Sequence, residues 1–302
     1  MTRNVTVKDL FEAFEFRGGD QALVNEQILL LAPIDKAGKN ALSFANDSER
    51  IPEGLKGAYI FVPGKSTELN VARRAGSNVL LFVENPRYSF SLAVKTLWQK
   101  PAPRTISDRA LVSESANLGG NIHVGFGTVI SSGAEIGDAT IIGNNVVIAE
   151  NVAIGKRCVI KSNTVIGEDG FGIVNDPHGK NFRVPHLGGV VIGDDVEIGS
   201  LCTVCSGTIE PTRIGNFVKL DDHIHVAHNV SIGENSIVTA CAEISGSVDI
   251  GRNVWIAPNC SINSGVSIAD DSFLGIGTVV SKSLKEVGAK YVGVPARKIG
   301  SR

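Results

Sequence analysis

An aliphatic residue recurs at every sixth position along most of the second two-thirds of the chain. Isoleucine, leucine or valine occupies each of these positions through residues 106–166, and the same spacing returns through residues 192–204. A second register begins at Ile214 and continues without interruption to Val280. The residue after the aliphatic one is often glycine, and the residue two positions before it is usually small or β-branched.

A six-residue period excludes an amphipathic helix, because 3.6 residues per turn cannot keep every sixth side chain on one face. Short strands separated by corners keep this period, with the aliphatic residue and the small residue pointing inward and the glycine absorbing the bend. Such hexapeptides are typical of a parallel β-helix. Three hexads make a coil of eighteen residues, so stacked residues eighteen positions apart lie about 4.8 Å from each other. The sequence therefore predicts a mainly β fold.

Residues 1–102 lack the hexad and are predicted to form a small α/β domain. Residues 57–64, "GAYIFVPG", and residues 77–85, "SNVLLFVEN", have the apolar runs of buried strands. Helices are expected at residues 67–75, "TELNVARRA", and at residues 88–99, "YSFSLAVKTLWQ".

Residues 103–283 are predicted to form the coil, interrupted by a loop insertion at residues 168–190. A loop of that length is more often functional than not. Residues 284–302 are expected to form a short C-terminal segment, with a short helical piece at "SLKEVGA" followed by "KYVGVPARKIG".

Composition excludes several classes of protein. A formal charge of −2 gives no electrostatic reason to bind nucleic acid or an anionic membrane. No apolar run approaches the roughly 20 residues of a membrane span, and "MTRNVTVKDLFEAF" lacks the apolar core of a signal peptide. The five cysteines have no disulfide-scaffold spacing, which favours the reducing cytoplasm. Cys158, Cys202 and Cys260 fall at inward positions, so the CxxC at residues 202–205 is not expected to bind zinc or to be a redox site.

Four features together resemble a known family: the N-terminal α/β domain, the hexads, "IGEDGFG" at residues 166–172 and "RIGNFVKLDDHIHVAHNVSIG" at residues 213–233. The chain resembles the UDP-3-O-acylglucosamine N-acyltransferases of lipid A biosynthesis. The resemblance implies a left-handed parallel β-helix, a cytoplasmic homotrimer with active sites between subunits, and acyl transfer from a thioester to a sugar amine. The ending "YVGVPARKIG" is similar instead to coenzyme-A-dependent acetyltransferases of nucleotide sugars.

The resemblance implies that His228, in "AHN", is the general base, and imidazole titrates in the range that this role needs. Gly246 lies one coil above His228, where the family places a backbone N–H donor for the oxyanion. Asp221 matches a family aspartate and is a candidate to orient His228. It precedes His228 by seven residues, so it would act across a subunit interface or through a bend, or else is a polar corner residue.

Substrate contacts are expected in two regions. In "LSFAND", which resembles the family's uracil-binding segment, Phe44 would stack on the base and Asn46 would form a hydrogen bond nearby; alternatively, Phe44 belongs to the core. Phe171 would line the acyl or pantetheine channel, or else anchor its loop on the coil. His225 and Asn229, which flank His228, are further candidate contacts.

In the loop, Lys180, Arg183 and His186 are candidate phosphate contacts, with a solvated loop as the simpler interpretation. A zinc ion shared by His223 and His225 is a weaker alternative, because the next coil offers no further histidine ligand.

The donor is expected to be a short acyl-CoA, with Arg297 or Lys298 meeting a phosphate, and no cofactor is expected to be bound permanently. The acceptor would be a nucleotide-linked amino sugar without a long 3-O-acyl chain, because Gly265 replaces a second family histidine. The alternative is the lipid A acyltransferase itself, which would use an acyl carrier protein thioester. A non-catalytic scaffold is a third interpretation, and the stacked His228 and Gly246 argue against it.

Overall fold

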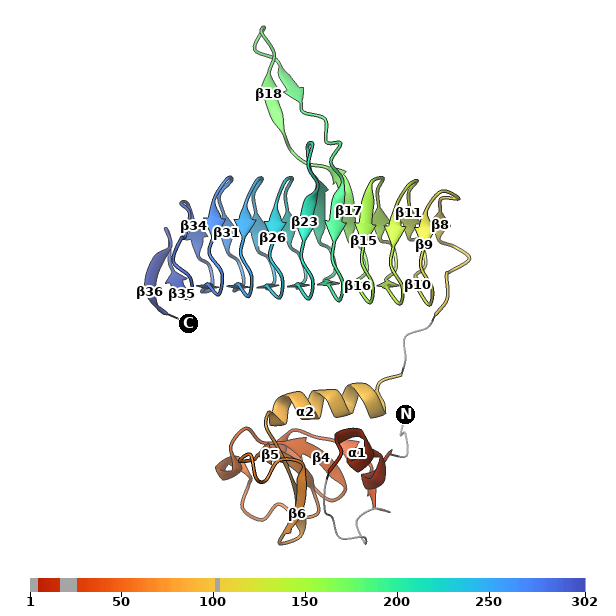
Figure 1. Ribbon diagram of the computed structural model, residues 1–302, viewed down its shortest axis with the longest axis vertical. Coiled ribbons are helices and arrows are strands. Elements are labelled where there is room, and N and C mark those ends of the chain that lie inside the picture. The colour runs from red at the N-terminus through yellow and green to blue at the C-terminus, as the bar shows by residue number, and fades with distance from the viewer. Residues whose placement is uncertain (1–4, 17–25, 101–103, 302) are drawn as a thin grey trace. The chain divides into compact units, whose positions relative to one another are not determined.

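The computed structural model describes residues 5–16, 26–100 and 104–301 (Figure 1). The chain divides into two compact units, Met1–Pro101 and Ala102–Arg302, each with its own hydrophobic core.

The N-terminal unit is built on a five-stranded sheet in the order β3-β4-β5-β7-β6, parallel except for the β6–β7 pair. The helix α2 packs against its central strands. The sheet strands are β3 (Leu30–Leu31), β4 (Ala41–Phe44), β5 (Tyr59–Pro63), β6 (Val71–Ala75) and β7 (Asn78–Val83). The other elements are β1 (Val5–Thr6), α1 (Val7–Phe14), β2 (Gln27–Ile28), η2 (Ile34–Lys36), η3 (Ser48–Arg50), α2 (Pro86–Ala93) and the π-helical η4 (Val94–Trp98).

The strands expected at residues 57–64 and 77–85 are confirmed by β5 and β7, and the helix expected at residues 88–99 is confirmed by α2 and η4. The helix expected at residues 67–75 is wrong, because this segment is a turn followed by β6. Only Gly76 and Ser77 separate β6 from β7, and Gly76 has a φ of 61°. A two-residue link with a left-handed glycine favours an antiparallel hairpin over a helix.

The second unit is a parallel β-helix, which confirms the fold that the hexad predicts. Strands eighteen residues apart pair in register, as Val129 does with Val147, except where an insertion lengthens a coil. Among the described residues the strands of the coil form three sheets, in which β36 runs antiparallel to β35 and the other pairs are parallel. Figure 1 shows the coils stacked along one axis.

The ten-stranded sheet contains β10 (His123–Val124), β13 (Ile141–Ile142), β16 (Val159–Ile160), β21 (Glu197–Ile198), β24 (Lys219–Leu220), β27 (Ile237–Val238), β30 (Trp255–Ile256), β33 (Phe273–Leu274), β35 (Ala289–Val292) and β36 (Arg297–Ser301). The nine-stranded sheet contains β8 (Leu111–Val112), β11 (Val129–Ile130), β14 (Val147–Ile148), β17 (Val165–Asp169), β22 (Thr203–Ser206), β25 (His225–Val226), β28 (Glu243–Ile244), β31 (Ser261–Ile262) and β34 (Val279–Val280). The eight-stranded sheet contains β9 (Asn117–Leu118), β12 (Glu135–Ile136), β15 (Val152–Ile154), β20 (Val190–Ile192), β23 (Thr212–Ile214), β26 (Ser231–Ile232), β29 (Asp249–Ile250) and β32 (Ser267–Ile268).

Where a glycine follows the aliphatic residue, it stands where a side chain would have no room, and its φ is not positive except at Gly167, so the expectation that it absorbs the bend is wrong. A Cβ atom on Gly137 would lie 2.6 Å from the carbonyl carbon of Gly155 in the next coil. The left-handed residue stands two positions after the glycine and is often asparagine, as at Asn121 (φ 56°) and Asn145 (φ 54°). Asparagine tolerates this conformation better than most residues do.

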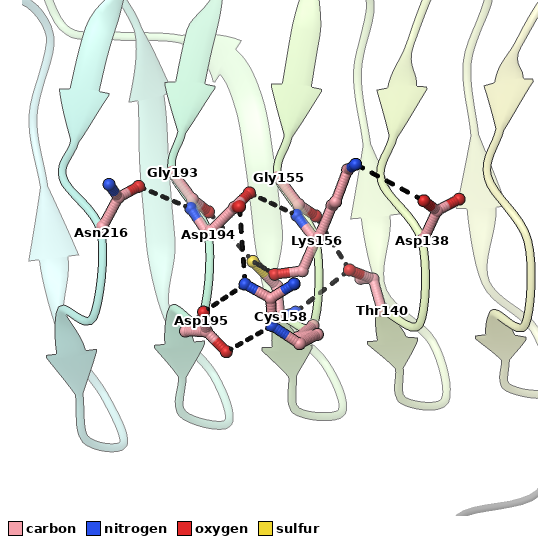
Figure 2. Close-up of polar contacts among 10 residues, drawn as sticks. Asp138, Thr140, Gly155, Lys156, Cys158, Gly193, Asp194, Asp195 and Asn216 are labelled. Atoms are coloured by element: carbon pink, nitrogen blue, oxygen red, sulfur yellow. Dashed lines mark hydrogen bonds and ion pairs between the residues drawn. The ribbon is translucent and has the colours of Figure 1, made fainter.

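Side chains satisfy backbone donors at many corners. In Figure 2 the N–H of Lys156 donates to Asp194 Oδ1 at 2.8 Å, and the N–H of Asp194 donates in turn to Asn216 Oδ1 at 2.8 Å. The ammonium group of Lys156 lies 3.6 Å from the carboxylate of Asp138. One coil thus supplies the side chain that caps the corner of the coil before it.

The inward small residues donate hydrogen bonds to carbonyl groups of the next coil. Thr128 Oγ1 donates to the Gly143 carbonyl at 2.7 Å, and Cys158 Sγ donates to the Gly193 carbonyl at 3.1 Å. Burial raises the pKa of the Cys158 and Cys202 thiols, which keeps them protonated at neutral pH. These cysteines therefore act as small core residues that satisfy a buried carbonyl.

The loop insertion forms a hairpin that projects from the coil, with β18 (Ile173–Asn175) paired antiparallel to β19 (Asn181–Arg183) (Figure 1). The helical piece expected at "SLKEVGA" is wrong. Leu284 instead forms a parallel bridge to Ile268, so this segment continues the coil, and Gly288 (φ 70°) precedes β35. In the part of the chain that the structure describes, no helix has both the length and the apolar character that crossing a bilayer requires.

Candidate active site

The candidate site lies along one edge of the nine-stranded sheet, where four neighbouring strands end. These strands are β17, β22, β25 and β28, which are adjacent in that order. The projecting loop leaves after β17, His228 stands at the corner after β25, and Gly246 stands at the corner after β28. Elements that are distant in sequence therefore converge because the coils stack.

The imidazole of His228 lies directly over Gly246. A Cβ atom on Gly246 would be 2.6 Å from Cε1 and 2.7 Å from Nε2 of that ring, distances that real Cβ contacts do not reach. Glycine is consequently the only residue type at position 246 that leaves the ring where it is. The stacking expected from the eighteen-residue coil places the two residues as the sequence predicts.

The backbone N–H of Gly246 has no hydrogen-bond acceptor among the described residues. At the corresponding corner of another coil, the N–H of Arg252 donates to Asp270 Oδ1 at 2.8 Å. Above Gly246 stands Ser264, whose hydroxyl group donates instead to the Gly246 carbonyl at 2.7 Å. This leaves a backbone donor beside the imidazole, which is the arrangement that an oxyanion site needs.

Asn229 also contacts the imidazole of His228. Its Oδ1 accepts a hydrogen bond from the N–H of Thr208 at 2.8 Å, so its amide nitrogen is directed toward the ring. That nitrogen lies 3.3 Å from Nδ1 of His228. The second ring nitrogen, Nε2, has no hydrogen-bond partner in residues 5–16, 26–100 or 104–301 and is free to meet a substrate.

His186 lies in surroundings that differ from those expected. The sequence predicts that it is a phosphate contact, with Lys180 and Arg183, or part of a solvated loop, but the residue is buried, with 7% of its surface exposed. Its ring centroid lies 5.2 Å from that of His228, with the rings inclined at 67°. No sequence signal identified this contact, because the loop has no repeat from which a register could be counted.

The loop glycine of "DGFG" lies against both histidines. A Cβ atom on Gly170 would be 3.0 Å from His186 Nε2 and 3.0 Å from His228 Cβ. The guanidinium group of Arg183 donates to the Gly170 carbonyl at 2.8 Å and lies over the ring of Phe171. The loop is therefore fixed where it passes the candidate base.

The surroundings of His228 favour its uncharged form. Burial lowers the pKa of His228 below its ordinary value, and the nearby imidazoles of His186 and His225 lower this pKa further. An uncharged imidazole at neutral pH can accept a proton, as a general base must.

The remaining candidate residues near the coil are Asp221, His225 and Phe171. The carboxylate of Asp221 accepts a hydrogen bond from the N–H of Ala240 at 3.2 Å, at the corner before that of His228. The exposed His225 is paired in register with Glu243 of the next coil. Phe171 is 81% exposed, so within one chain it lines no channel.

The candidates of the N-terminal unit and of the C-terminal strand lie in other surroundings. Phe44 is half-buried, with its ring 5.2 Å from that of Phe90, so it packs on the domain core, and Asn46 is exposed nearby. Arg297 is exposed on β36, and Lys298 forms an ion pair with Glu286.

His223 is exposed at a left-handed corner (φ 61°). Within the described ranges no three histidine, cysteine, aspartate or glutamate residues are grouped closely enough to hold a metal ion.

A family profile for the bacterial transferase hexapeptide (six repeats) matches residues 133–168 and 211–246. The chain carries this repeat. The UDP-3-O-acylglucosamine N-acyltransferase of Bordetella parapertussis is 41% identical to it over 131 residues, which are 42% of this chain and 36% of that protein. The corresponding protein of Coxiella burnetii is 37% identical over 123 residues, which are 40% of this chain and 36% of that protein. The chain thus spans about a third of the length of the curated relatives that it matches.

The crystal structure of a UDP-N-acetylglucosamine acyltransferase from Francisella novicida superposes with a TM-score of 0.60 at 24% identity, covering 65% of this chain and 70% of that chain. It shows that the two proteins share a fold. The resemblance to UDP-3-O-acylglucosamine N-acyltransferases that the sequence indicated is confirmed over the matched residues.

Proposed function

We propose that the protein transfers an acyl group from a thioester to the amine of a nucleotide-linked glucosamine. The observation that carries this proposal is the imidazole of His228, which lies over Gly246 beside a backbone N–H without an acceptor among the described residues. A base and an oxyanion donor on adjacent coils are the two groups that acyl transfer to an amine requires.

In this reaction the amine attacks the thioester carbonyl, and a C–N bond forms. The amine proton passes to the free nitrogen of His228, while the carbonyl oxygen becomes an oxyanion that accepts a hydrogen bond from the Gly246 N–H. Collapse of the intermediate breaks the C–S bond. The leaving thiolate takes a proton from the imidazolium, which restores neutral His228 for the next cycle.

For the acceptor, the names of the matched relatives favour a 3-O-acylated UDP-glucosamine, which was the alternative to the shorter acceptor expected from the sequence. A transferase with such an acceptor would act in lipid A biosynthesis. For the donor, both an acyl carrier protein thioester and an acyl-CoA remain in the proposal. The exposed guanidinium group of Arg297 supports acyl-CoA, because it is available to pair with a phosphate.

The cellular compartment follows from the same chemistry. All five cysteines are unpaired, which suits a reducing compartment, and the thioester donors are intracellular metabolites. We therefore place the reaction in the cytoplasm.

The test is a set of steady-state assays that pair each donor with each acceptor, using wild-type protein and His228→Ala. We expect the variant to keep its circular dichroism spectrum and to lose about 10²–10⁴-fold in turnover, the usual contribution of a general base. Wild-type turnover in the variant would refute the assignment of the base. A carrier-protein thioester that exceeds the matching acyl-CoA by about tenfold in kcat/KM would identify the donor, and acylation of neither acceptor would refute the proposed function.

A further inference from the structure

We propose that His186 is a positioning residue for His228, whose buried ring holds the base in place and limits how readily it takes up a proton beneath the projecting loop. This inference rests on the proposed function only insofar as His228 is the base. Nothing in the hexad assigns His186 a role, since it stands outside the repeat.

The first support is the burial of His186 without partners. Both of its ring nitrogens are buried, and neither has a hydrogen-bond partner among the residues that the structure describes. A buried polar group that lacks partners is destabilising, so its presence in a fold calls for an explanation. A residue that only anchored the loop would be served better by leucine or phenylalanine.

The second support is the rigidity of its attachment. The N–H of Leu187, the next residue, donates to the Thr208 carbonyl at 2.9 Å, and the N–H of Thr208 donates to Asn229 Oδ1 at 2.8 Å. Asn229 in turn contacts the His228 ring. A continuous path of hydrogen bonds therefore ties the end of the loop that carries His186 to the corner that carries the base.

The third support is the shape of the loop beside the two rings. A Cβ atom on Gly172 would lie 3.2 Å from Cε1 of His186, and one on Gly170 would be in similarly close contact with both histidines. The glycines of "DGFG" thus allow the loop backbone to approach the rings closely. The ring of His186 consequently fills the space between this backbone and the base.

The charged and titratable groups around His228 explain what this arrangement does. His186 faces it from the loop and His225 from β25. The Arg183 guanidinium donates to the Gly170 carbonyl, and Glu243 stands beside His225 in the register of the next strand, with its carboxylate accepting from the Ser245 hydroxyl group. Two imidazolium ions at a centroid distance of 5.2 Å repel each other, so the pair holds a second proton poorly. His228 is thereby kept ready to accept the amine proton.

The test uses His186→Gln, His186→Phe and the control His178→Gln. The control changes another histidine of the same loop, which is exposed at its turn. For each full-length protein, the His228 Cε1–H resonance is titrated by NMR, and kcat/KM is measured against pH. The NMR titration does not depend on activity, so it still reports on the pair if the proposed reaction proves wrong.

In both His186 variants we expect the pKa of His228 to rise toward its ordinary value, because the neighbouring imidazole that lowers it is removed. The acid limb of kcat/KM should move to higher pH by about half a unit or more, the effect of two unit charges about 5 Å apart even in water. The control should titrate as the wild type does. An unchanged His228 titration in both variants would overturn the proposal, and so would an equal shift in the control.

Discussion

Gly246 is the residue on which the candidate site depends most directly. Replacement by alanine would place a Cβ atom 2.6 Å from His228 Cε1, so the ring would have to move. We expect Gly246→Ala to lower kcat/KM by about 10²-fold, the effect that a misplacement of about 1 Å has on an oriented catalytic group.

The matched control is Gly120→Ala, at the same position of an earlier hexad. There a Cβ atom would meet only Asp138 Oδ1, at 3.8 Å, and φ is not positive. We expect this variant to retain wild-type kinetics and thermal stability. Equal kinetics in the two variants would show that the crowding of the His228 ring has no catalytic consequence.

Asn229 offers a second test at the residue scale, through pH dependence. In Asn229→Asp a carboxylate would still accept from the Thr208 N–H but would stand beside His228 Nδ1 as a negative charge. An opposite charge favours the imidazolium, so the pKa of His228 should rise and the acid limb of kcat/KM should move to higher pH. A pH profile that coincides with that of the wild type would contradict the contact.

At the scale of the elements, the strands of the coil are held by their inward aliphatic side chains. Ile142, on β13, is fully buried, whereas Ile276, at a corner after β33, is 72% exposed. We expect Ile142→Ala to reduce the free energy of unfolding by about 2–5 kcal/mol, since it leaves a cavity. Ile276→Ala should change this free energy by less than about 0.5 kcal/mol. Urea titration followed by circular dichroism measures both, and similar midpoints would contradict the inward assignment.

Neighbouring elements together form a candidate site that no single element contains. The sheet aligns the ends of β17, β25 and β28, so a loop, a base and a backbone donor meet at one edge. The hairpin of β18 and β19 projects from this edge, and its base rather than its tip carries the residues that contact His228.

At the scale of the whole molecule, the candidate base lies on the outer surface of a coil and needs a second wall to exclude water. Phe171, Leu187 and Ile209, which are near this edge in sequence and each more than 75% exposed, would be covered by a second copy of the chain. We therefore predict the homotrimer that the resemblance implies. Light scattering should give three times the chain mass of 31.8 kDa. A fully active monomer would contradict this prediction.

The amino-acid sequence by itself determined the coil and the part of the site that obeys its period. Eighteen residues separate His228 from Gly246, and repetition at that interval is a local property that can be counted. For the same reason the prediction that Cys158, Cys202 and Cys260 point inward is confirmed. The composition of "TELNVARRA" predicts a helix, although the turn that follows it at Gly76 and Ser77 joins two strands, β6 and β7.

Only the tertiary structure decided where the non-repeating segments lie. The end of the loop that carries His186 is placed by long-range bonds between two insertions: the N–H of Gly207 donates to the Gly189 carbonyl at 3.0 Å, and the N–H of Gly188 donates to the Gly207 carbonyl at 2.9 Å. The six-residue period does not predict this pairing. The tight fit of Gly246 under the imidazole, and the engagement of Asp221 with Ala240, likewise depend on the distance between coils and not on residue type. A repeat fixes register because each coil copies the one before it, whereas a loop is placed by the partners that satisfy its own backbone groups.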